Sequence, residues 1–203
     1  MLRLYRILSR HFGPQRWWPA RTPLEVIVGA VLVQNTSWTG VEHAVANLSR
    51  LRLLQLDRLV QVQASRLAGI IRPAGCSRVK ARRLLTLLHW LKTRGGLDQL
   101  RHSPTSELRA ELLAINGVGP ETADSILLYA LHRPVFVVGA YTRRILTRYG
   151  LMRGDEDYEK VRVAVEKALP HRSGLYGEFH ALLVRLGKTH CRPVPKCDGC
   201  PLE

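Results

Sequence analysis

The chain has 203 residues, 46% of them hydrophobic, and carries 31 Lys and Arg against 16 Asp and Glu, a formal net charge of +15. It is long enough to bury a core as one or two small domains, and it lacks the run of about eighteen apolar residues that a membrane-spanning helix needs. The charge fits a polyanionic partner, but charge alone leaves ribosomal, membrane-surface and DNA-binding functions open.

The N-terminal residues predict a packed amphipathic helix. Leu4, Ile7, Leu8 and Phe12 recur at roughly helical spacing with arginines between them. The segment lacks the uninterrupted apolar core of a secretory signal. A mitochondrial-type presequence is the alternative, but the apolar positions favour a packed helix. We therefore expect a cytoplasmic protein that is not bound to a membrane.

The next expected helix begins at Thr22. Thr22-Pro-Leu-Glu25 has the form of a capping box, with proline at the first helical position. It precedes Val26-Ile-Val-Gly-Ala-Val-Leu-Val33, a segment that is apolar on all sides and therefore belongs to the core. Such a run also suits a buried strand. The cap favours a helix.

Further amphipathic stretches follow, separated by turns rich in Gly and Pro. They predict an all-α fold without internal repeats. The expected helices cover residues 41–54, 56–68, 78–91, 141–149, 158–169 and 175–187.

The most informative segment lies at residues 112–124 and contains Ile115-Asn-Gly-Val-Gly-Pro120. Gly117 and Gly119 can adopt positive φ and leave no Cβ in the way of a ligand. The free amides of the helix that starts at Pro120 predict a phosphate site. Apolar residues on both sides predict a helix–hairpin–helix that clamps a nucleic-acid backbone. An ordinary αα-corner is the alternative, and the net charge favours the clamp.

Three of the four cysteines lie close together near the C-terminus, among prolines and a glycine. Cys191, Cys197 and Cys200 have spacings that converge thiolates on one zinc ion or iron–sulfur cluster. The asymmetric spacing and the Cys-Pro ending favour the cluster. Both kinds of site use four ligands, and the remaining cysteine, Cys76, is distant in sequence. Free thiols in a disordered tail are the alternative.

The hairpin, a loop containing Pro134 and the cysteine loop together resemble the endonuclease III branch of the helix–hairpin–helix (HhH-GPD) DNA glycosylase superfamily. The resemblance runs from about Leu4 to the end of the chain. The amino-acid sequence of Gly117–Tyr129 is most similar to the 3-methyladenine DNA glycosylase subgroup. It implies two helical lobes that flank a DNA-binding cleft. These are a six-helix-bundle lobe at 22–132, with its hairpin at 112–124, and a second lobe of 1–21 plus 133–203, with its cysteine loop at 191–200.

The resemblance also implies a cofactor on the cysteine loop. A [4Fe–4S] cluster would take Cys191, Cys197 and Cys200 as ligands. Its fourth cysteine would fall beyond Glu203 and is not present in this chain. The loop is basic and is expected to contact DNA phosphate through Lys188.

The resemblance implies base-excision repair, in which a damaged base is flipped out and its N-glycosidic bond is hydrolysed. Bifunctional members carry a Schiff-base lysine where this chain has Glu121, so we expect a monofunctional enzyme that uses water. An acid that stabilises the helix dipole is the alternative role for Glu121. Gly139 stands where the catalytic Asp is expected, and glycine is an acceptable N-cap. We therefore expect an inactivated glycosylase.

Two alternatives remain at the level of function. A catalytically silent protein that binds damaged DNA is one, and a helix–hairpin–helix module that grips DNA without recognising lesions is the other. The expected partner is double-stranded DNA with a damaged base, most simply an alkylated purine. The protein is expected to act as a monomer at the nucleoid.

The resemblance further implies which residues reach the DNA. Gln34 matches the residue that enters the gap left by the flipped base, and a polar C-terminal helix cap is its alternative role. Cys76 and Ser77 match the loop that inserts into the opposite strand, although both are small. Trp38 and Tyr141 line the base pocket or belong to the core. The other implied DNA contacts are Asn35, Gly117, Val118, Gly119 and Thr122.

Overall fold

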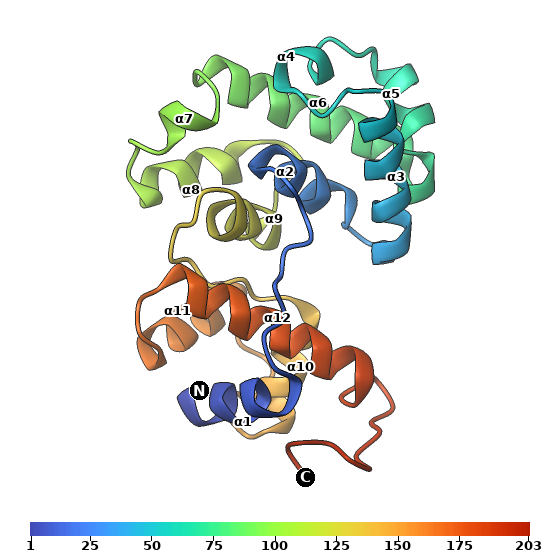
Figure 1. Cartoon of the computed structure of the whole chain (residues 1–203). Coiled ribbons are helices and arrows are strands. Elements are labelled where there is room, and N and C mark those ends of the chain that lie inside the picture. Colours follow the sequence, from blue (N-terminus) through green and yellow to red (C-terminus); the bar gives the residue numbers. More distant parts are fainter. The chain divides into compact units, whose positions relative to one another are not determined.

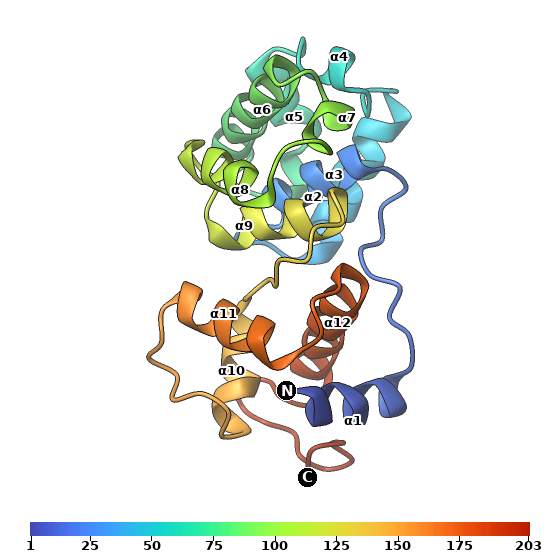
Figure 2. The ribbon, with the colours of Figure 1, turned by 90° about the vertical axis from the view of Figure 1, so that its left-hand side faces the viewer.

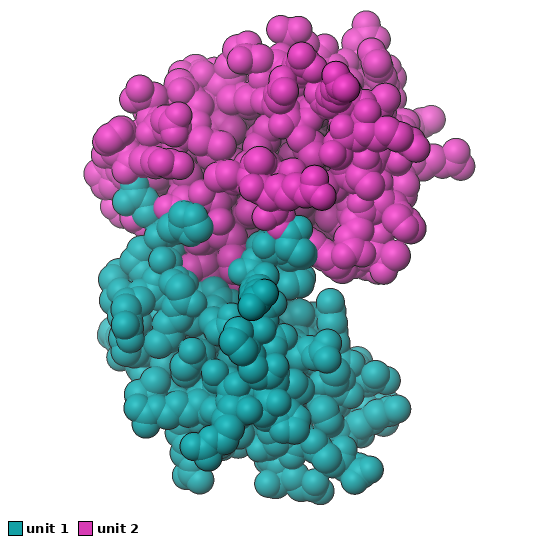
Figure 3. Space-filling model, viewed as in Figure 1, with its two compact units in different colours: residues 1–19, 132–203 teal, residues 20–131 magenta.

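The computed structural model describes all 203 residues, and its regular elements are all helices (Figures 1 and 2). The predicted all-α class is confirmed. None of these helices combines the length and the apolar character needed to span a membrane. The chain forms two compact units (Figure 3). Unit 1 comprises Met1–Pro19 and His132–Glu203, and unit 2 comprises Ala20–Leu131.

Unit 2 is organised around α2 (Pro23–Leu32), which contacts α3, α6, α9 and η2. The short segments α4, η1 and α7 connect the longer helices (Figure 1). Besides α2, the unit contains α3 (Trp38–Arg50), α4 (Leu56–Leu59), α5 (Ala64–Ile70), η1 (Arg72–Ala74), α6 (Ser77–Thr93), α7 (Leu97–Leu100), α8 (Thr105–Ala114), α9 (Pro120–Ser125) and the π-helical η2 (Ile126–Ala130).

The expected N-terminal cap starts α2, with the return bond of the capping box shifted from the Thr22 amide to the Arg21 amide. The Thr22 hydroxyl accepts a hydrogen bond from the Glu25 amide at 3.2 Å, and the Glu25 carboxylate accepts one from the Arg21 amide at 2.8 Å. The helix is buried on all sides from Leu24 to Leu32 except at Glu25. The helical interpretation of this apolar run is therefore confirmed, and the strand alternative is wrong.

The prediction of one helix over residues 56–68 is wrong. The chain forms α4 and α5 with a turn between them. Val60 and Val62 are both buried, whereas positions two apart on a helix do not share a face. The turn lets both valines enter the core. The helix predicted from residue 41 starts earlier, at Trp38, because the Ser37 hydroxyl accepts a hydrogen bond from the Gly40 amide.

Unit 1 contains four helices: α1 (Leu2–Phe12), α10 (Ala140–Arg148), α11 (Tyr158–Ala168) and α12 (Ser173–Thr189). Helix α12 contacts both α1 and α10 (Figure 2). The predicted N-terminal helix is confirmed, and its Leu4 and Leu8 are fully buried. The core also holds Phe136, whose ring centroid lies 5.8 Å from that of Phe179.

Candidate functional site

The hairpin between α8 and α9 needs glycine at one of its two glycine positions. Gly117 has φ +88°, and a Cβ there would collide with the side chain of Arg83. Gly119 is the N-cap of α9, with φ −87° and ψ 176°, so the expected use of positive φ at Gly119 is wrong. An N-cap takes extended backbone, which any residue can adopt. A Cβ at Gly119 would meet no atom within 4 Å.

The first turn of α9 presents backbone amides without helical acceptors. The Val118 amide donates back to the Ile115 carbonyl at 3.0 Å, and the first intrahelical bond runs from Ala123 to Gly119 at 2.9 Å. The amides of Glu121 and Thr122 precede that bond and therefore have no partner within the helix. Because α9 continues directly into η2, its positive end favours one anionic group.

Gln34 joins the segment after α2 to the hairpin. Its side-chain amide donates to the Gly117 carbonyl at 3.0 Å and to the Thr122 hydroxyl at 3.1 Å. Its carbonyl oxygen accepts a hydrogen bond from Arg83 at 2.7 Å. The alternative of a C-terminal helix cap is wrong, because α2 ends at Leu32 and Val33 is its C-cap. Gln34 holds the hairpin in place in this structure.

Lys80 is a residue of this region that the sequence interpretation missed. Its side chain is only 3% exposed. The ammonium donates to the Leu32 carbonyl at 2.8 Å and to the Ala74 carbonyl at 2.7 Å. Burial lowers the pKa of Lys80 below its usual value. Helical spacing could have indicated this burial, because Lys80 shares a face of α6 with the buried residues Leu84 and Leu88.

The other residues implied to reach DNA differ in exposure. Asn35 and Cys76 are exposed and adopt positive φ of 51° and 45°. Ser77 is half-buried at the start of α6, and Trp38 is half-buried at the start of α3. The exposed positions are therefore the turns that precede α3 and α6, not the helices themselves.

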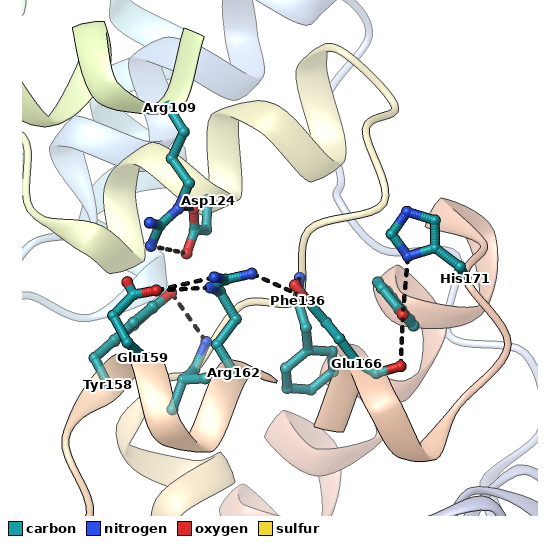
Figure 4. Close-up of polar contacts among 10 residues, drawn as sticks. Arg109, Asp124, Phe136, Tyr158, Glu159, Arg162, Glu166 and His171 are labelled. Atoms are coloured by element: carbon teal, nitrogen blue, oxygen red, sulfur yellow. Dashed lines mark hydrogen bonds and ion pairs between the residues drawn. The ribbon is translucent and has the colours of Figure 1, made fainter. Parts of the chain in front are cut away.

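Two acids lie on α9 and have different surroundings. Glu121 is the second residue of the helix, and its side chain is exposed to solvent. Nearby protein atoms still desolvate its carboxyl, which raises the pKa of Glu121. Asp124 is fully buried and forms a two-bond ion pair with Arg109, with N–O distances of 2.6 and 3.1 Å (Figure 4). Asp124 is thus committed to this ion pair.

Gly139 is the buried N-cap of α10, with φ −91° and ψ 177° and no side-chain cap. The extended segment before it is held by α11 (Figure 4). Glu166 accepts a hydrogen bond from the Phe136 amide at 2.8 Å, and the Tyr158 hydroxyl accepts one from the Val138 amide at 3.2 Å. The backbone at position 139 is therefore fixed, although the residue there has no side chain.

The first turn of α10 contains one buried hydroxyl and one ring packed against α12. Thr142 is fully buried, and its hydroxyl lacks a hydrogen-bond partner. The ring of Tyr141 lies so close to Gly187 that a Cβ on this glycine would collide with it. The Arg144 guanidinium lies 5.2 Å from the centroid of the Tyr141 ring. These contacts favour a packing role for Tyr141.

Two arginines of α10 hold the start of the cysteine loop. Arg144 donates to the Cys191 carbonyl at 2.7 Å, and Arg148 donates to the Pro193 carbonyl at 2.7 Å and to the Cys191 sulfur at 3.4 Å. No three His, Cys, Asp or Glu side chains in the structure are close enough to hold one metal ion. The loop thus supplies three thiols of the right chemistry that are not gathered around one centre.

Lys188 is exposed near the end of α12. Its ammonium lies 5.9 Å from the centroid of the Trp17 ring, a distance at which a cation and an aromatic face attract each other. The side chain can therefore contact solvent or an anion while resting on this ring.

Comparisons with known proteins give a consistent result. Residues 28–171 match the family described as HhH-GPD superfamily base excision DNA repair protein. A provisionally named DNA repair glycosylase of Methanocaldococcus jannaschii is 45% identical over 204 residues, covering 99% of this chain and 93% of that protein. Endonuclease III of Thermotoga maritima is 27% identical over 182 residues, covering 89% of this chain and 81% of that protein.

Solved structures show the same likeness in three dimensions. The H. pylori 3-methyladenine DNA glycosylase bound to 1,N6-ethenoadenine has a TM-score of 0.77 at 28% identity, and the match covers 91% of this chain and 97% of that one. A non-covalent complex of endonuclease III with DNA has a TM-score of 0.83 at 24% identity, covering 99% and 91%. The shared fold extends over both units.

Proposed function

Since the chain belongs to the HhH-GPD superfamily of base excision DNA repair proteins, whose enzymes are DNA N-glycosylases, we propose that it binds double-stranded DNA at a damaged base. The base would be flipped out of the stack before it is examined. The net charge of +15 supports a DNA partner. Membership of the superfamily confirms the resemblance that the hairpin and the cysteine loop indicated.

The hairpin would bind one phosphate of the DNA backbone. The amides of Glu121 and Thr122 have no acceptor within the helix, and the missing Cβ of Gly119 leaves the approach open. Thr122 would contribute only its backbone, because the residue is buried and its hydroxyl accepts a hydrogen bond from Gln34. The exposed turns that contain Asn35 and Cys76 would reach the base stack. Lys188 would add a second phosphate contact. The protein would act as a monomer.

The reaction would be monofunctional hydrolysis. Glu121 occupies the position where bifunctional members carry a nucleophilic lysine, and a carboxylate cannot form a Schiff base with the sugar. Water must then attack the sugar carbon. A carboxylate near that carbon stabilises the developing positive charge and orients the water.

Position 139 is where this carboxylate is expected, and it is a glycine. The backbone there is held by Glu166 and Tyr158, and the acid on the preceding helix, Asp124, is paired with Arg109. We therefore propose that this chain retains the glycosylase framework and lacks its catalytic group. The absence of a side chain at Gly139, on a fixed backbone, is the observation that carries this conclusion.

The proposed substrate class is an alkylated purine. It is supported by the amino-acid sequence of the hairpin and by the similarity to the H. pylori 3-methyladenine DNA glycosylase, whose structure holds 1,N6-ethenoadenine. A non-catalytic protein that binds damaged DNA is the second candidate function. Gly139 itself favours this candidate, because a native glycine would leave recognition as the only activity.

We also propose that Cys191, Cys197 and Cys200 bind an iron–sulfur cluster. Their spacing and the anchoring of the loop by Arg144 and Arg148 support this. Such a cluster would give the loop a fixed shape, and no step of the hydrolysis uses it. Quantifying iron and acid-labile sulfide in protein purified without oxygen tests the assignment.

Base release from duplexes with single defined lesions tests the proposed function. The chain and its Gly139→Asp variant would be compared on 3-methyladenine, 7-methylguanine, 1,N6-ethenoadenine, uracil, thymine glycol and a T·G mismatch. We expect release only by the variant and only from alkylated purines. If neither protein releases a base and both prefer damaged DNA, the binding function replaces the enzymatic one.

A further inference from the structure

Lys80 connects two chain segments that are far apart in sequence. One of its acceptors, the Leu32 carbonyl, belongs to the last residue of α2, and the other, the Ala74 carbonyl, belongs to the last residue of η1. Each acceptor lies two residues before a position assigned to DNA contact, Gln34 in one case and Cys76 in the other. A single ammonium group therefore fixes the starting points of both turns.

The chemistry of this contact indicates that Lys80 fixes the separation of two carbonyl groups and does not serve mainly to stabilise the fold. Lys80 is 3% exposed, and its acceptors are backbone carbonyls at the ends of helices, where the partial charge is negative. Burying an ammonium is costly, and an apolar side chain of similar size would pack there without that cost. It could not hold two carbonyls at a fixed separation.

Other contacts tie together the helices that flank these two turns. A Cβ on Gly40, in the first turn of α3, would come within 2.5 Å of the Pro73 carbonyl oxygen, so α3 and η1 approach as closely as backbones can. One helical turn beyond Lys80, Arg83 donates to Gln34 at 2.7 Å. Helix α6 thus holds the turn after α2 directly and holds its own N-terminal turn through Lys80.

We propose that Lys80 is a positioning residue for damage recognition, which sets the separation between the turn at 33–36 and the turn at 75–77. The inference rests on the proposed function, in which these two turns enter the duplex. Lys80 does not touch DNA, because it is buried. It acts by keeping two exposed turns at the spacing that an opened base step requires.

The test is the preference of the protein for a duplex containing a tetrahydrofuran abasic-site analogue over the same duplex without it. A 2-aminopurine opposite the analogue reports insertion by its fluorescence. We expect Lys80→Met to reduce the preference about 10-fold or more, and to change affinity for intact duplex less than about 3-fold, because small misplacements of a positioned group have large effects. The 2-aminopurine fluorescence of the complex should fall together with the preference for the abasic-site duplex.

Two further variants separate positioning from stability. Lys80→Arg keeps the cation and its donors and should recover most of the preference. Leu88→Ala removes a buried side chain two turns further along α6 and should lower stability without changing the preference. If Lys80→Met does not fold, Lys80→Gln replaces it with the same expected loss.

The outcomes are distinct. An unaltered preference in Lys80→Met, or an equal loss in Leu88→Ala, would overturn the role of Lys80 while leaving the proposed function intact. Equal binding of both duplexes by the unmodified chain would overturn the proposed function, and the inference with it.

Discussion

Helices α9 and α10, one in each unit, both begin at a glycine in almost the same backbone conformation. Gly119 has φ −87° and ψ 176°, Gly139 has φ −91° and ψ 177°, and neither helix has a side-chain cap. At Gly119 the missing side chain leaves amides open to an anion. At Gly139 the missing side chain would, on the proposed function, remove the carboxylate that the hydrolysis needs. On the proposed function, the same local structure would permit phosphate binding at one helix and prevent catalysis at the other.

The fold around the start of α10 does not depend on a side chain at position 139. The segment before Gly139 is held by hydrogen bonds that the backbone amides of Phe136 and Val138 donate to side chains of α11. These bonds do not involve the side chain at position 139. An aspartate there can be lost with little change in structure, since glycine is only a few tenths of a kcal/mol worse as an N-cap.

Adding a carboxylate at position 139 should have the largest effect. We expect Gly139→Asp to release an alkylated base about 10³-fold faster than the unmodified chain, the range typical of a charge-stabilising group. Gly139→Asn is the matched control, with the same size and capping ability and no charge. Single-turnover assays measure both. Equal rates for the two variants would mean that the carboxylate is not what the chain lacks.

Removing Asp124, the acid nearest to position 139 in the sequence, tests whether another carboxylate takes part in catalysis. Asp124→Asn would leave Arg109 without its buried partner, and we expect the free energy of unfolding to fall by about 3 kcal/mol. Denaturant titration measures the loss. In the Gly139→Asp background the rate of base release should persist under conditions where the protein stays folded. Abolished release in folded protein would make Asp124 part of the chemistry.

Unit 1 should also show a pH dependence that is independent of position 139. Burial lowers the pKa of His180 to about 4. In the unfolded chain the His180 imidazole is protonated below about pH 6.5, whereas in the folded chain it stays neutral down to about pH 4. The contribution of neutral His180 to the free energy of unfolding is therefore complete above pH 6.5 and is lost as the pH falls toward 4. The expected loss is about 3 kcal/mol. Comparing unfolding at pH 7 and pH 4 with a His180→Gln variant isolates it, and an equal pH dependence in both proteins would disprove it.

The two glycines of the hairpin should differ in their tolerance of a side chain. Gly117→Ala places a Cβ at positive φ and against Arg83, and we expect a loss of about 1 to 3 kcal/mol in the free energy of unfolding. Gly119→Ala has extended backbone and open space, so its loss should be smaller. Thermal unfolding of the two variants makes the comparison. A larger loss at Gly119 would contradict the structure.

A carboxylate at position 119 should have the opposite effect from one at 139. Gly119→Asp would cap the amides of α9 with its own side chain and repel phosphate, and we expect affinity for duplex DNA to fall about 10-fold, with a shallower salt dependence. Gly119→Asn controls for the capping without the charge. Titrations at several salt concentrations measure both. Unchanged affinity in Gly119→Asp would mean that this helix end does not bind phosphate.

Helix caps and glycine turns could be predicted from the sequence more readily than contacts between distant segments. The cap at Thr22 and the positive φ of Gly117 follow from residue type and neighbours, and both are present. The conformation of Gly119 was predicted wrongly, because a glycine at a helix start does not need positive φ. The helical class was evident from periodicity, but the break between α4 and α5 depends on core packing.

The contacts that join distant segments could not be read from the sequence. Gln34 was interpreted as the residue that enters the gap left by the flipped base or as a polar helix cap, whereas its hydrogen-bond partners lie more than eighty positions away in the hairpin. Lys80 sits in a run of basic residues that looks solvated. Its place on the apolar face of α6 was detectable, but its two carbonyl partners were not.

The most direct measurement is the binding of the unmodified chain to a duplex carrying one 1,N6-ethenoadenine, compared with the same duplex carrying adenine, followed by recovery of the DNA. We expect tighter binding of the damaged duplex and complete recovery of the ethenoadenine within the strand. Equal binding of the two duplexes would contradict the recognition site. Release of the base would contradict the conclusion that Gly139 leaves the protein without its catalytic group.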